Sequence, residues 1–348
     1  MSKWLARIIS GALPVSFTIM VMPWAAYAGT PAPTTFPKID IKLGHAMATE
    51  TSSHQGTLKF AELVKQKTGG AVNVQVFPSG QLGGDNDLLD QIRNGVIQMH
   101  ALGGPALAGL RGWEPLGVFT LPFLFKGDNE EEQYATLVKL MRGPIGKEIT
   151  ENARRASGVR ALDASWWYGV RQTTTKTKQI IKPDDFRGLK MRAPDQPIHK
   201  VSMSTLGAAV TPMALSELYT ALQMGVVEGQ QNPLNTIYAY KFYEVQKYLT
   251  LLGDMMMSFN ITMNDKFFQS LSPELRDILE KSAMEAGVYQ SQLQLNANKR
   301  NLEDLKAKGM IVNTVNRAEF SEKTKDAWKG FESQFGKGLY EKVVEALK

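Results

Sequence analysis

The sequence predicts an α/β fold with two similar lobes, and three observations carry this prediction. Strand and helix patterns alternate from residue 40 onward, which favours a parallel sheet. One helix–turn–strand unit occurs twice, and one helical pattern near the C-terminus is longer than a single lobe. The chain has 348 residues, of which 43% are hydrophobic, so it is long enough to form two domains with their own cores.

The first segments define a β-α-β order. Residues 40–45 alternate apolar and polar side chains and are a predicted strand, as are residues 72–77. Between them, residues 53–68 have an apolar stripe at helical spacing, and two glycines at 69–70 end the predicted helix.

The repeated unit lies at residues 88–98 and 218–228. Its two copies share leucine, glycine and valine at matching positions, with Gly95 equivalent to Gly225. Each copy predicts a helix that ends at a left-handed glycine and turns directly into a strand, which in the second copy is residues 226–228. The repeat indicates two similar lobes, although chance similarity of two common units is the alternative.

The middle of the chain contains further elements. Residues 130–141 are a predicted helix, and residues 159–164 are a predicted strand that an aromatic cluster follows at Trp166–Tyr168. Residues 183–188 read as a single helical turn with acids near its start. They lead into a short buried strand at residues 188–194, bounded by glycine and proline.

The long helical pattern begins after Ser272, a good N-cap residue, with Pro273 in the first helical position. A helix from residue 273 to 308 would be roughly 54 Å long, so it could lie along both lobes. An interruption at Gly287 is the alternative.

The N-terminus has the pattern of a secretory signal peptide, residues 1–28. Lys3 and Arg7 precede an apolar run at residues 8–23, and Ala26–Ala28 gives a cleavage motif. A membrane anchor is the alternative, but breakers interrupt the run, and a span needs about 20 apolar residues. We therefore expect a soluble, exported protein in a periplasm.

Composition and motifs exclude several classes of function. The net charge of +6 is interspersed along the chain, which argues against nucleic-acid binding. There is no cysteine, so no disulfide or thiolate nucleophile can form. The four histidines have no zinc-site spacing, and we expect no metal and no cofactor. His45 and His54 bracket the turn after the first strand, where each is either a ligand contact or a lone surface residue.

Polar donors stand at strand ends. Arg192 ends the strand at residues 188–194, and its guanidinium could hold a carboxylate in bidentate fashion. Arg171 and Asn232 also follow strands. No nucleophile accompanies these donors, so they indicate an anion-binding site. A structural ion pair at Arg192 and an exported enzyme acting on a carboxylate are the alternatives.

Several motifs occur in the same order as in a known family. They are residues 77–84, 121–123, 169–174, 186–192, 211–223, 226–233 and 241–248. In these motifs the sequence resembles the periplasmic solute-binding proteins of tripartite ATP-independent periplasmic (TRAP) transporters. The resemblance implies the two-lobed periplasmic binding protein fold, with hinge strands and a long helix spanning both lobes. It also implies delivery of an organic acid to a membrane permease.

The resemblance also implies site residues and boundaries. The carboxylate-clamping arginine of the family falls on Arg192, a second arginine on Arg171, and the family's asparagine on Asn232. The full set of expected ligand contacts is Arg192, Arg171, Asn232, Trp167, His54, Met213 and Asp254. We expect lobe I at residues 29–168 plus 258–297 and lobe II at residues 169–257 plus 298–348, in a monomer.

Specificity is less defined. Residues 101–106 contain no acid, unlike the family's sialic-acid binders, so sialate is not the expected ligand. The bulky Trp166 and Met255–Met257 either line the pocket or pack in the core. We expect a monocarboxylate such as a sugar acid or a hydroxy or keto acid, with a C4-dicarboxylate or an aromatic acid as the alternative. A chemoreceptor-associated binding protein would differ only in its partner.

Overall fold

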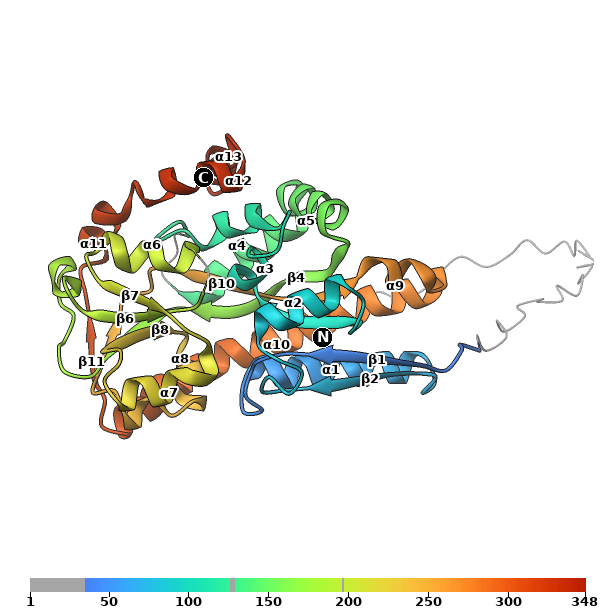
Figure 1. The fold of residues 1–348 in the computed structure, drawn as a ribbon, viewed down its shortest axis with the longest axis horizontal. Helices are drawn as coiled ribbons and strands as arrows, with labels where there is room; N and C mark the ends of the chain where they lie inside the picture. The colour runs from blue at the N-terminus through green and yellow to red at the C-terminus, as the bar shows by residue number, and fades with distance from the viewer. Residues whose placement is uncertain (1–34, 126–128, 196) are drawn as a thin grey trace, which may run out of the picture. The chain divides into compact units, whose positions relative to one another are not determined.

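The computed structural model describes residues 35–125, 129–195 and 197–348, which contain two β-sheets (Figure 1). The strand order is β2-β1-β3-β10-β4 in the first sheet and β11-β9-β5-β8-β6-β7 in the second. The predicted signal peptide, residues 1–28, lies outside the described residues. Within the described part, no helix has the length and apolar character needed to cross a bilayer.

The first sheet is built on a parallel β-α-β-α-β unit. Its elements are β1 (Ile39–Gly44), α1 (Ser52–Lys67), β2 (Val72–Phe77), α2 (Asp85–Arg93) and β3 (Met99–Gly103). The central β1 pairs in parallel with β2 on one side and β3 on the other. The strands and the helix predicted at the start of the chain are therefore confirmed to within one residue.

The second sheet contains the same unit. Its elements are β6 (Lys190–Ala193), α6 (Pro197–Thr205), β7 (Ala209–Pro212), α7 (Leu215–Gln223) and β8 (Gly229–Asn232). Here β6 is central and pairs in parallel with β7 and β8. The repeat seen in the sequence thus marks two α/β units of the same topology.

One detail of the repeat was predicted wrongly. The turn glycines Gly95 and Gly225 are left-handed, with φ of 74° and 72°, but neither leads directly into a strand. Val226 is 52% exposed in a turn, and β8 begins only at Gly229. Val227 in the same turn is fully buried, so exposed and buried side chains alternate in this turn as they do in a strand.

Two connections join the sheets. The long strand β4 (Val159–Val170) belongs to the first sheet and passes through Arg171 into β5 (Gln172–Thr175) of the second. In return, β9 (Tyr248–Leu251) leads into β10 (Met256–Asn264), which lies between β3 and β4 and is antiparallel to both. The strand predicted at 159–164 continues further because residues up to Val170 pair with β10.

The long helix α10 (Pro273–Ala307) is unbroken over 35 residues, about 52 Å, and contacts α1, β4 and α8 (Figure 1). Gly287 does not interrupt it. A Cβ atom at Gly287 would lie 2.4 Å from Nε1 of Trp166, so glycine lets the helix and β4 approach closely.

Shorter elements complete the unit Phe36–Lys348. They are α3 (Gly104–Leu107), η1 (Glu114–Thr120), α4 (Glu130–Arg142), α5 (Pro144–Ser157), η2 (Pro183–Phe186), α8 (Leu234–Ala239), η3 (Phe242–Glu244), α9 (Asp265–Ser270), β11 (Ile311–Thr314), α11 (Arg317–Thr324), η4 (Ala327–Phe331), α12 (Glu332–Phe335) and α13 (Leu339–Ala346). The C-terminal helices α12 and α13 pack against η1, whose apolar side chains belong to a core cluster that includes β3, β4 and β10.

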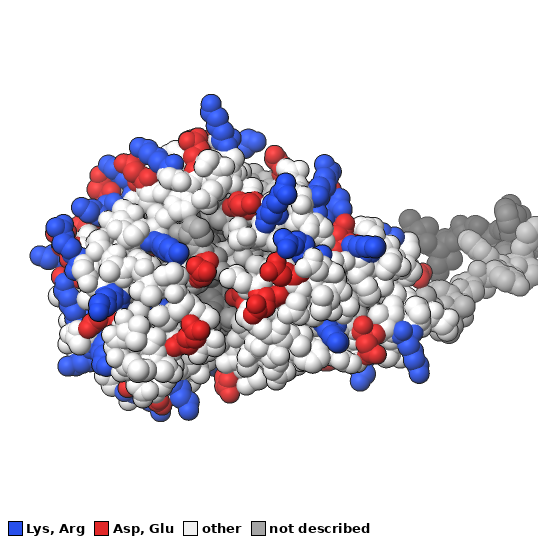
Figure 2. Space-filling view, viewed as in Figure 1, with Lys and Arg blue, Asp and Glu red and all other residues white. Residues whose placement is uncertain are grey.

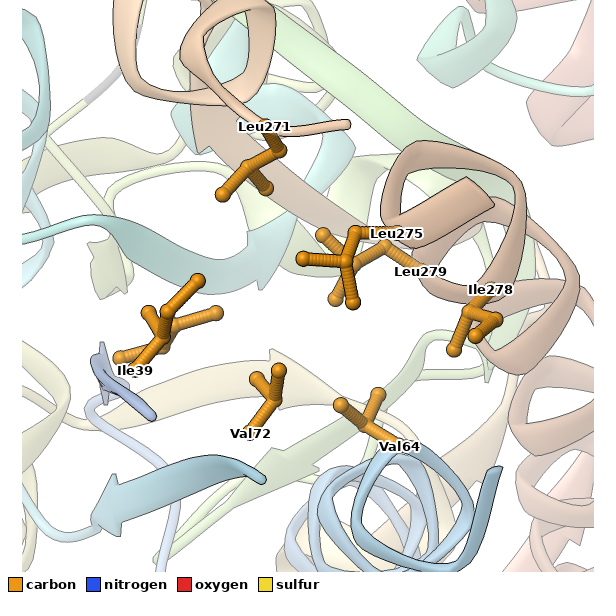
Figure 3. Close-up of a pocket in the computed structure, with 8 residues that line it drawn as sticks. Ile39, Val64, Val72, Leu271, Leu275, Ile278 and Leu279 are labelled. Atoms are coloured by element: carbon orange, nitrogen blue, oxygen red, sulfur yellow. The ribbon is translucent and has the colours of Figure 1, made fainter. Parts of the chain in front are cut away.

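A second core cluster covers the other face of the first sheet. Figure 3 shows aliphatic side chains from β1, β2, α1 and the start of α10 facing one another there. Ile39, Val72 and Leu275 are among them, and the gap that they surround has no room for a water molecule. This region is packed core and offers no polar group to a ligand.

Candidate functional site

A cavity of about 650 Å³ lies at the carboxyl ends of both parallel units. Its walls come from the loops after β1, β2 and β3 on one side and after β6, β7 and β8 on the other. Figure 2 shows the surface hollowed between α2 and α7, with acidic side chains on both sides of the hollow. Ligands of open α/β sheets collect in this position, so the cavity is the candidate site.

Arg192 lies near the end of β6 and is only 3% exposed. Its Nε and Nη2 atoms donate to the Met213 carbonyl oxygen at 3.1 and 2.8 Å. Within the described part of the chain, these bonds to a neutral carbonyl are the hydrogen bonds that its guanidinium makes. The alternative of a structural ion pair at Arg192 is therefore not what the structure shows.

Arg171 occupies the crossing between β4 and β5 and is also buried. Its Nη1 lies 3.1 Å from the sulfur of Met257, and its Nη2 donates to the Gln231 carbonyl. The Nε atom has no partner among the described residues. Like Arg192, this guanidinium lines the cavity and is held by neutral groups.

The two arginines make the cavity wall electropositive. Burial lowers the pKa of Arg171 to about 10, and burial together with the Arg171 charge lowers the pKa of Arg192 to about 9. His199 also lines the cavity, and burial and both arginines hold its pKa well below the usual range, so it is neutral at pH 7. Two buried cations held by neutral partners form a site suited to an anion.

Asn232 and Met213 complete the group of predicted residues on the cavity wall. Asn232 ends β8, and its Nδ2 donates to Oε1 of Gln230 at 2.5 Å. Met213 follows β7, and its carbonyl fixes Arg192. The structure thus brings four predicted residues together from separate strands: Arg171, Arg192, Met213 and Asn232.

The other three predicted residues do not line the cavity. Trp167 packs in the core, where its Nε1 donates to Glu130 at 3.0 Å. His54 begins α1 and shares a 3.1 Å hydrogen bond with His45. Asp254 is buried, accepts a 2.5 Å hydrogen bond from Ser202, and has a pKa that burial raises. None of the three is among the described side chains that line the cavity.

The bulky residues divide between core and cavity. Trp166 is fully buried, and its Nε1 donates to the Ala283 carbonyl of α10 at 3.0 Å. Met255 and Met256 are buried as well, whereas Met257 lines the cavity beside Arg171. Tyr168, the last residue of the aromatic cluster, also reaches the cavity.

Reasoning from the sequence missed the acidic residues of the cavity. They are Asp85, Asp87, Asp195 and Glu217. Two of them could have been found from the repeat. When Leu88 is aligned with Leu218, Asp87 of the first copy takes the position of Glu217 in the second. Both stand in the first turn of a helix that follows a cleft-lining loop.

Tyr240 is a further residue that reasoning from the sequence missed, and no sequence pattern indicates it. Its hydroxyl accepts a hydrogen bond from the Ala48 N–H at 3.1 Å and donates to the Ala46 carbonyl at 3.2 Å. Tyr240 follows α8 after the second unit, while the loop 46–48 follows β1 of the first. The residue therefore ties the two sides of the cavity together.

Comparison with known proteins identifies the family. The model of the bacterial extracellular solute-binding proteins, family 7, matches residues 43–334. The chain belongs to this family. A C4-dicarboxylate-binding periplasmic protein of Rhodobacter capsulatus is 34% identical over 292 residues, which cover 83% of each chain. The 2,3-diketo-L-gulonate-binding periplasmic protein of Escherichia coli is 29% identical and covers 81% of this chain and 83% of its own.

Solved structures agree with this assignment. A sugar acid binding protein from Advenella mimigardefordensis in complex with galactonate has a TM-score of 0.83 at 30% identity, over 90% of this chain and 98% of that one. A TRAP periplasmic solute-binding protein from Shewanella oneidensis with bound succinate has a TM-score of 0.82 at 27% identity, over 89% and 100%. The predicted family, two-lobed fold and periplasmic location are thereby confirmed, and the protein is a TRAP solute-binding protein.

Proposed function

We propose that the cavity binds one monocarboxylate, with its carboxylate on Arg192 and with Arg171 and Asn232 as partners. One observation carries the proposal. Among the described residues that line the cavity, the lysine and arginine side chains are Arg171 and Arg192 alone, and both are buried against neutral groups. One pair of cations at one wall suits one carboxylate, which can take charged hydrogen bonds from both.

The ligands of related structures support an acid of this kind. The relatives from Advenella mimigardefordensis and Ochrobactrum anthropi are described with galactonate and L-fuconate, which are sugar acids. The relative from Shewanella oneidensis is described with succinate, so dicarboxylates also occur in the family. The family therefore includes proteins with monocarboxylate and with dicarboxylate ligands. The proposal of a ligand with one carboxylate group rests on the charges of this cavity.

We further propose that the protein binds without catalysis and passes its ligand, as a monomer, to a TRAP permease. Asp254 is a buried carboxyl that could be considered as a catalytic base, but it accepts hydrogen bonds from Ser202 and Gln231 and is not among the described residues that line the cavity. An enzyme acting on the carboxylate would return a changed compound. Recovery of the bound acid unchanged after long incubation, checked by mass spectrometry, is the expected result.

The lobes proposed to move are residues 29–168 plus 258–297 and residues 169–257 plus 298–348. Crossing strands and one long helix connect them, as hinge closure requires. Closure around the ligand excludes water and strengthens the ion pair. Because α12 and α13 pack against η1, the C-terminal segment of the second lobe has to move with the first or slide on it.

The test is the thermal stability of the mature protein with a panel of sugar acids, dicarboxylates, keto acids and aromatic acids. A ligand at 100 times its Kd should stabilise the protein by about 2.7 kcal/mol. We expect a raised Tm with a monocarboxylate. A panel in which only dicarboxylates raise the Tm would contradict the proposal, as would a panel with no response.

A further inference from the structure

The buried side chain of Asn298 joins three helices at the point where the boundary of the proposed lobes crosses α10. It is 3% exposed and is not among the described side chains that line the cavity. Its Nδ2 donates to Oε2 of Glu130 in α4 at 2.8 Å, and its Oδ1 accepts from the N–H of Asn235 in α8 at 3.0 Å. Gln294 on α10 donates to the same Oδ1 at 3.1 Å. One amide therefore connects both lobes, because Glu130 belongs to the first and Asn235 to the second.

The partners of this amide fix its orientation. A backbone N–H can only donate, so the atom of Asn298 that faces Asn235 is the oxygen. The nitrogen then faces Glu130, whose carboxylate accepts the hydrogen bond. Trp167 Nε1 in β4 donates to the same Oε2 atom of Glu130 at 3.0 Å. Each polar atom of the Asn298 amide thus has the partner that its chemistry requires, and Glu130 extends the connection to β4.

The hydrogen bonds continue on both sides of this amide. Asn235 Oδ1 accepts from the N–H of Ser52, the first residue of α1, at 3.2 Å. In β4, the N–H of Trp167 donates to Ser291 Oγ at 2.9 Å, and its carbonyl accepts from Gln290 Nε2 at 2.9 Å. Both partners of Trp167 lie on α10. A series of hydrogen bonds therefore runs from α1 through α8, α10 and α4 to β4.

The same network ends beside two residues of the cavity wall. Gly169 in β4 lies against Asn298, since a Cβ atom there would be 3.1 Å from Nδ2 of Asn298. Arg171 follows Gly169 by two residues, and Asn235 follows Asn232 by three. Arg171 and Asn232 both line the cavity. The segments that present them are therefore held relative to each other at Asn298, outside the cavity.

We propose that Asn298 is a positioning residue, which sets the walls of the cavity relative to each other through its bonds to Glu130 and Asn235. It affects ligand affinity without touching the ligand. A buried donor or acceptor without a partner is costly, so arrangements of the lobes that break these bonds are disfavoured. This inference rests on the proposed function, because the two walls have to close on one carboxylate.

The first experiment measures the distance between the walls by double electron–electron resonance. The chain has no cysteine, so Asp90→Cys on α2 and Thr220→Cys on α7 provide the two spin-label sites. Both residues are exposed and occupy equivalent positions of the repeat. The labelled protein then carries Asn298→Asp, Glu130→Ala or Glu130→Gln. Asn296→Ala, at an exposed asparagine of α10 that bonds only its own helix among the described residues, is the matched control.

We expect the variants to differ in the width of the label-distance distribution without ligand. Asn298→Asp keeps the shape of the side chain but replaces the donor that faces Glu130 with an acceptor, so the distribution should widen at least 1.5-fold. Glu130→Ala should have the same effect because Asn298 and Trp167 lose their acceptor. Glu130→Gln retains an acceptor oxygen and should keep the wild-type width, as should Asn296→Ala. In the double variant of Glu130→Gln with Asn298→Asp, the new amide can donate to the new carboxylate, and most of the wild-type width should return.

Calorimetry of the unlabelled mature protein with galactonate, succinate, pyruvate and benzoate measures the consequence for binding. For each acid that binds the wild type, affinity should fall at least tenfold in Asn298→Asp and Glu130→Ala. Glu130→Gln and Asn296→Ala should stay within threefold of the wild type. Circular dichroism and Tm establish that each variant is folded. A lowered Tm with unchanged label distances and unchanged affinity would mean that these bonds only stabilise the fold, and it would overturn the inference.

The two measurements separate this inference from the proposed function. If Asn298→Asp and Glu130→Ala leave the label distances unchanged while Arg192→Ala loses carboxylate affinity, the anchor stands and the positioning role of Asn298 is refuted. If none of the four acids binds the wild type but the distances widen as expected, Asn298 positions the walls and the proposed function is contradicted.

Discussion

The two parallel units have the same strand order but different side chains where their strands end. In the unit β6–β8, the strand ends carry Arg192 and Asn232, and the Met213 carbonyl after β7 fixes the Arg192 guanidinium. In the unit β1–β3, the corresponding loops contribute backbone, small residues and acids such as Asp85. The comparison shows that the same topology places residues of both units at the cavity, while the side chains there make one wall basic and the other acidic.

The largest effect should come from removing the anchor of the second unit. Arg192→Ala deletes charged hydrogen bonds that contribute about 1.5–3 kcal/mol each, so two of them correspond to at least a hundredfold loss of carboxylate affinity by calorimetry. Arg187→Ala, at an exposed arginine paired with Asp184, should bind normally. If Arg192→Ala binds the carboxylate within threefold of the wild-type affinity, Arg192 is not the anchor. The proposed difference between the two units is then refuted.

The first sheet packs closely on α10 through its strand β4. In Gly287→Ala the new Cβ would clash with Trp166, and overpacking of this kind costs about 1–3 kcal/mol of unfolding free energy. Gly330→Ala, where a Cβ meets nothing within 4 Å, is the matched control. Equal Tm values for the two variants would show that the contact is loose.

Carboxylate binding at the cavity wall that Arg171 and Arg192 form should also depend on pH. Burial and the Arg171 charge lower the pKa of Arg192 in the free protein, so its guanidinium is charged at neutral pH and is easier to deprotonate at alkaline pH than an exposed arginine. Carboxylate affinity should therefore be constant around neutral pH and decrease only at alkaline pH. Titrations at each pH, with circular dichroism to confirm folding, test this. An affinity that rises with pH would contradict the prediction.

The smallest effect should be at the contact that joins the units. Tyr240→Phe removes a hydroxyl that bonds both Ala46 and Ala48, and the loss of about 0.5–1.5 kcal/mol should weaken binding two- to tenfold. Tyr238→Phe on the same segment is the control. If Tyr240→Phe binds like wild type, the two walls are held together by other contacts.

The sequence predicted the fold well because its signals were local. Alternating strands, a capped helix from Ser272 and the glycines of the repeat all act through neighbouring residues. The strand predicted at 226–228 failed because Val227 is buried in a turn, and burial alone imitates a strand.

The site was harder to predict from sequence because its residues meet only in three dimensions. Arg192 lies near the end of β6 and Asn232 ends β8, and strand ends are visible in a sequence. Trp167 and Tyr168 are neighbours in β4, and one enters the core while the other reaches the cavity, because successive side chains of a strand point to opposite faces. The sequence does not show which face of the strand meets the cavity.

The position of β10 has a consequence for how the chain can be made. The strands β3 and β4 are complete by residue 170, but the strand between them spans residues 256–264. Until that segment has emerged, the inner edge of β3 has no partner, and an open edge is prone to pair with other chains. The first sheet therefore cannot close on the N-terminal half alone, and its closure has to wait until residues 256–264 have been synthesised.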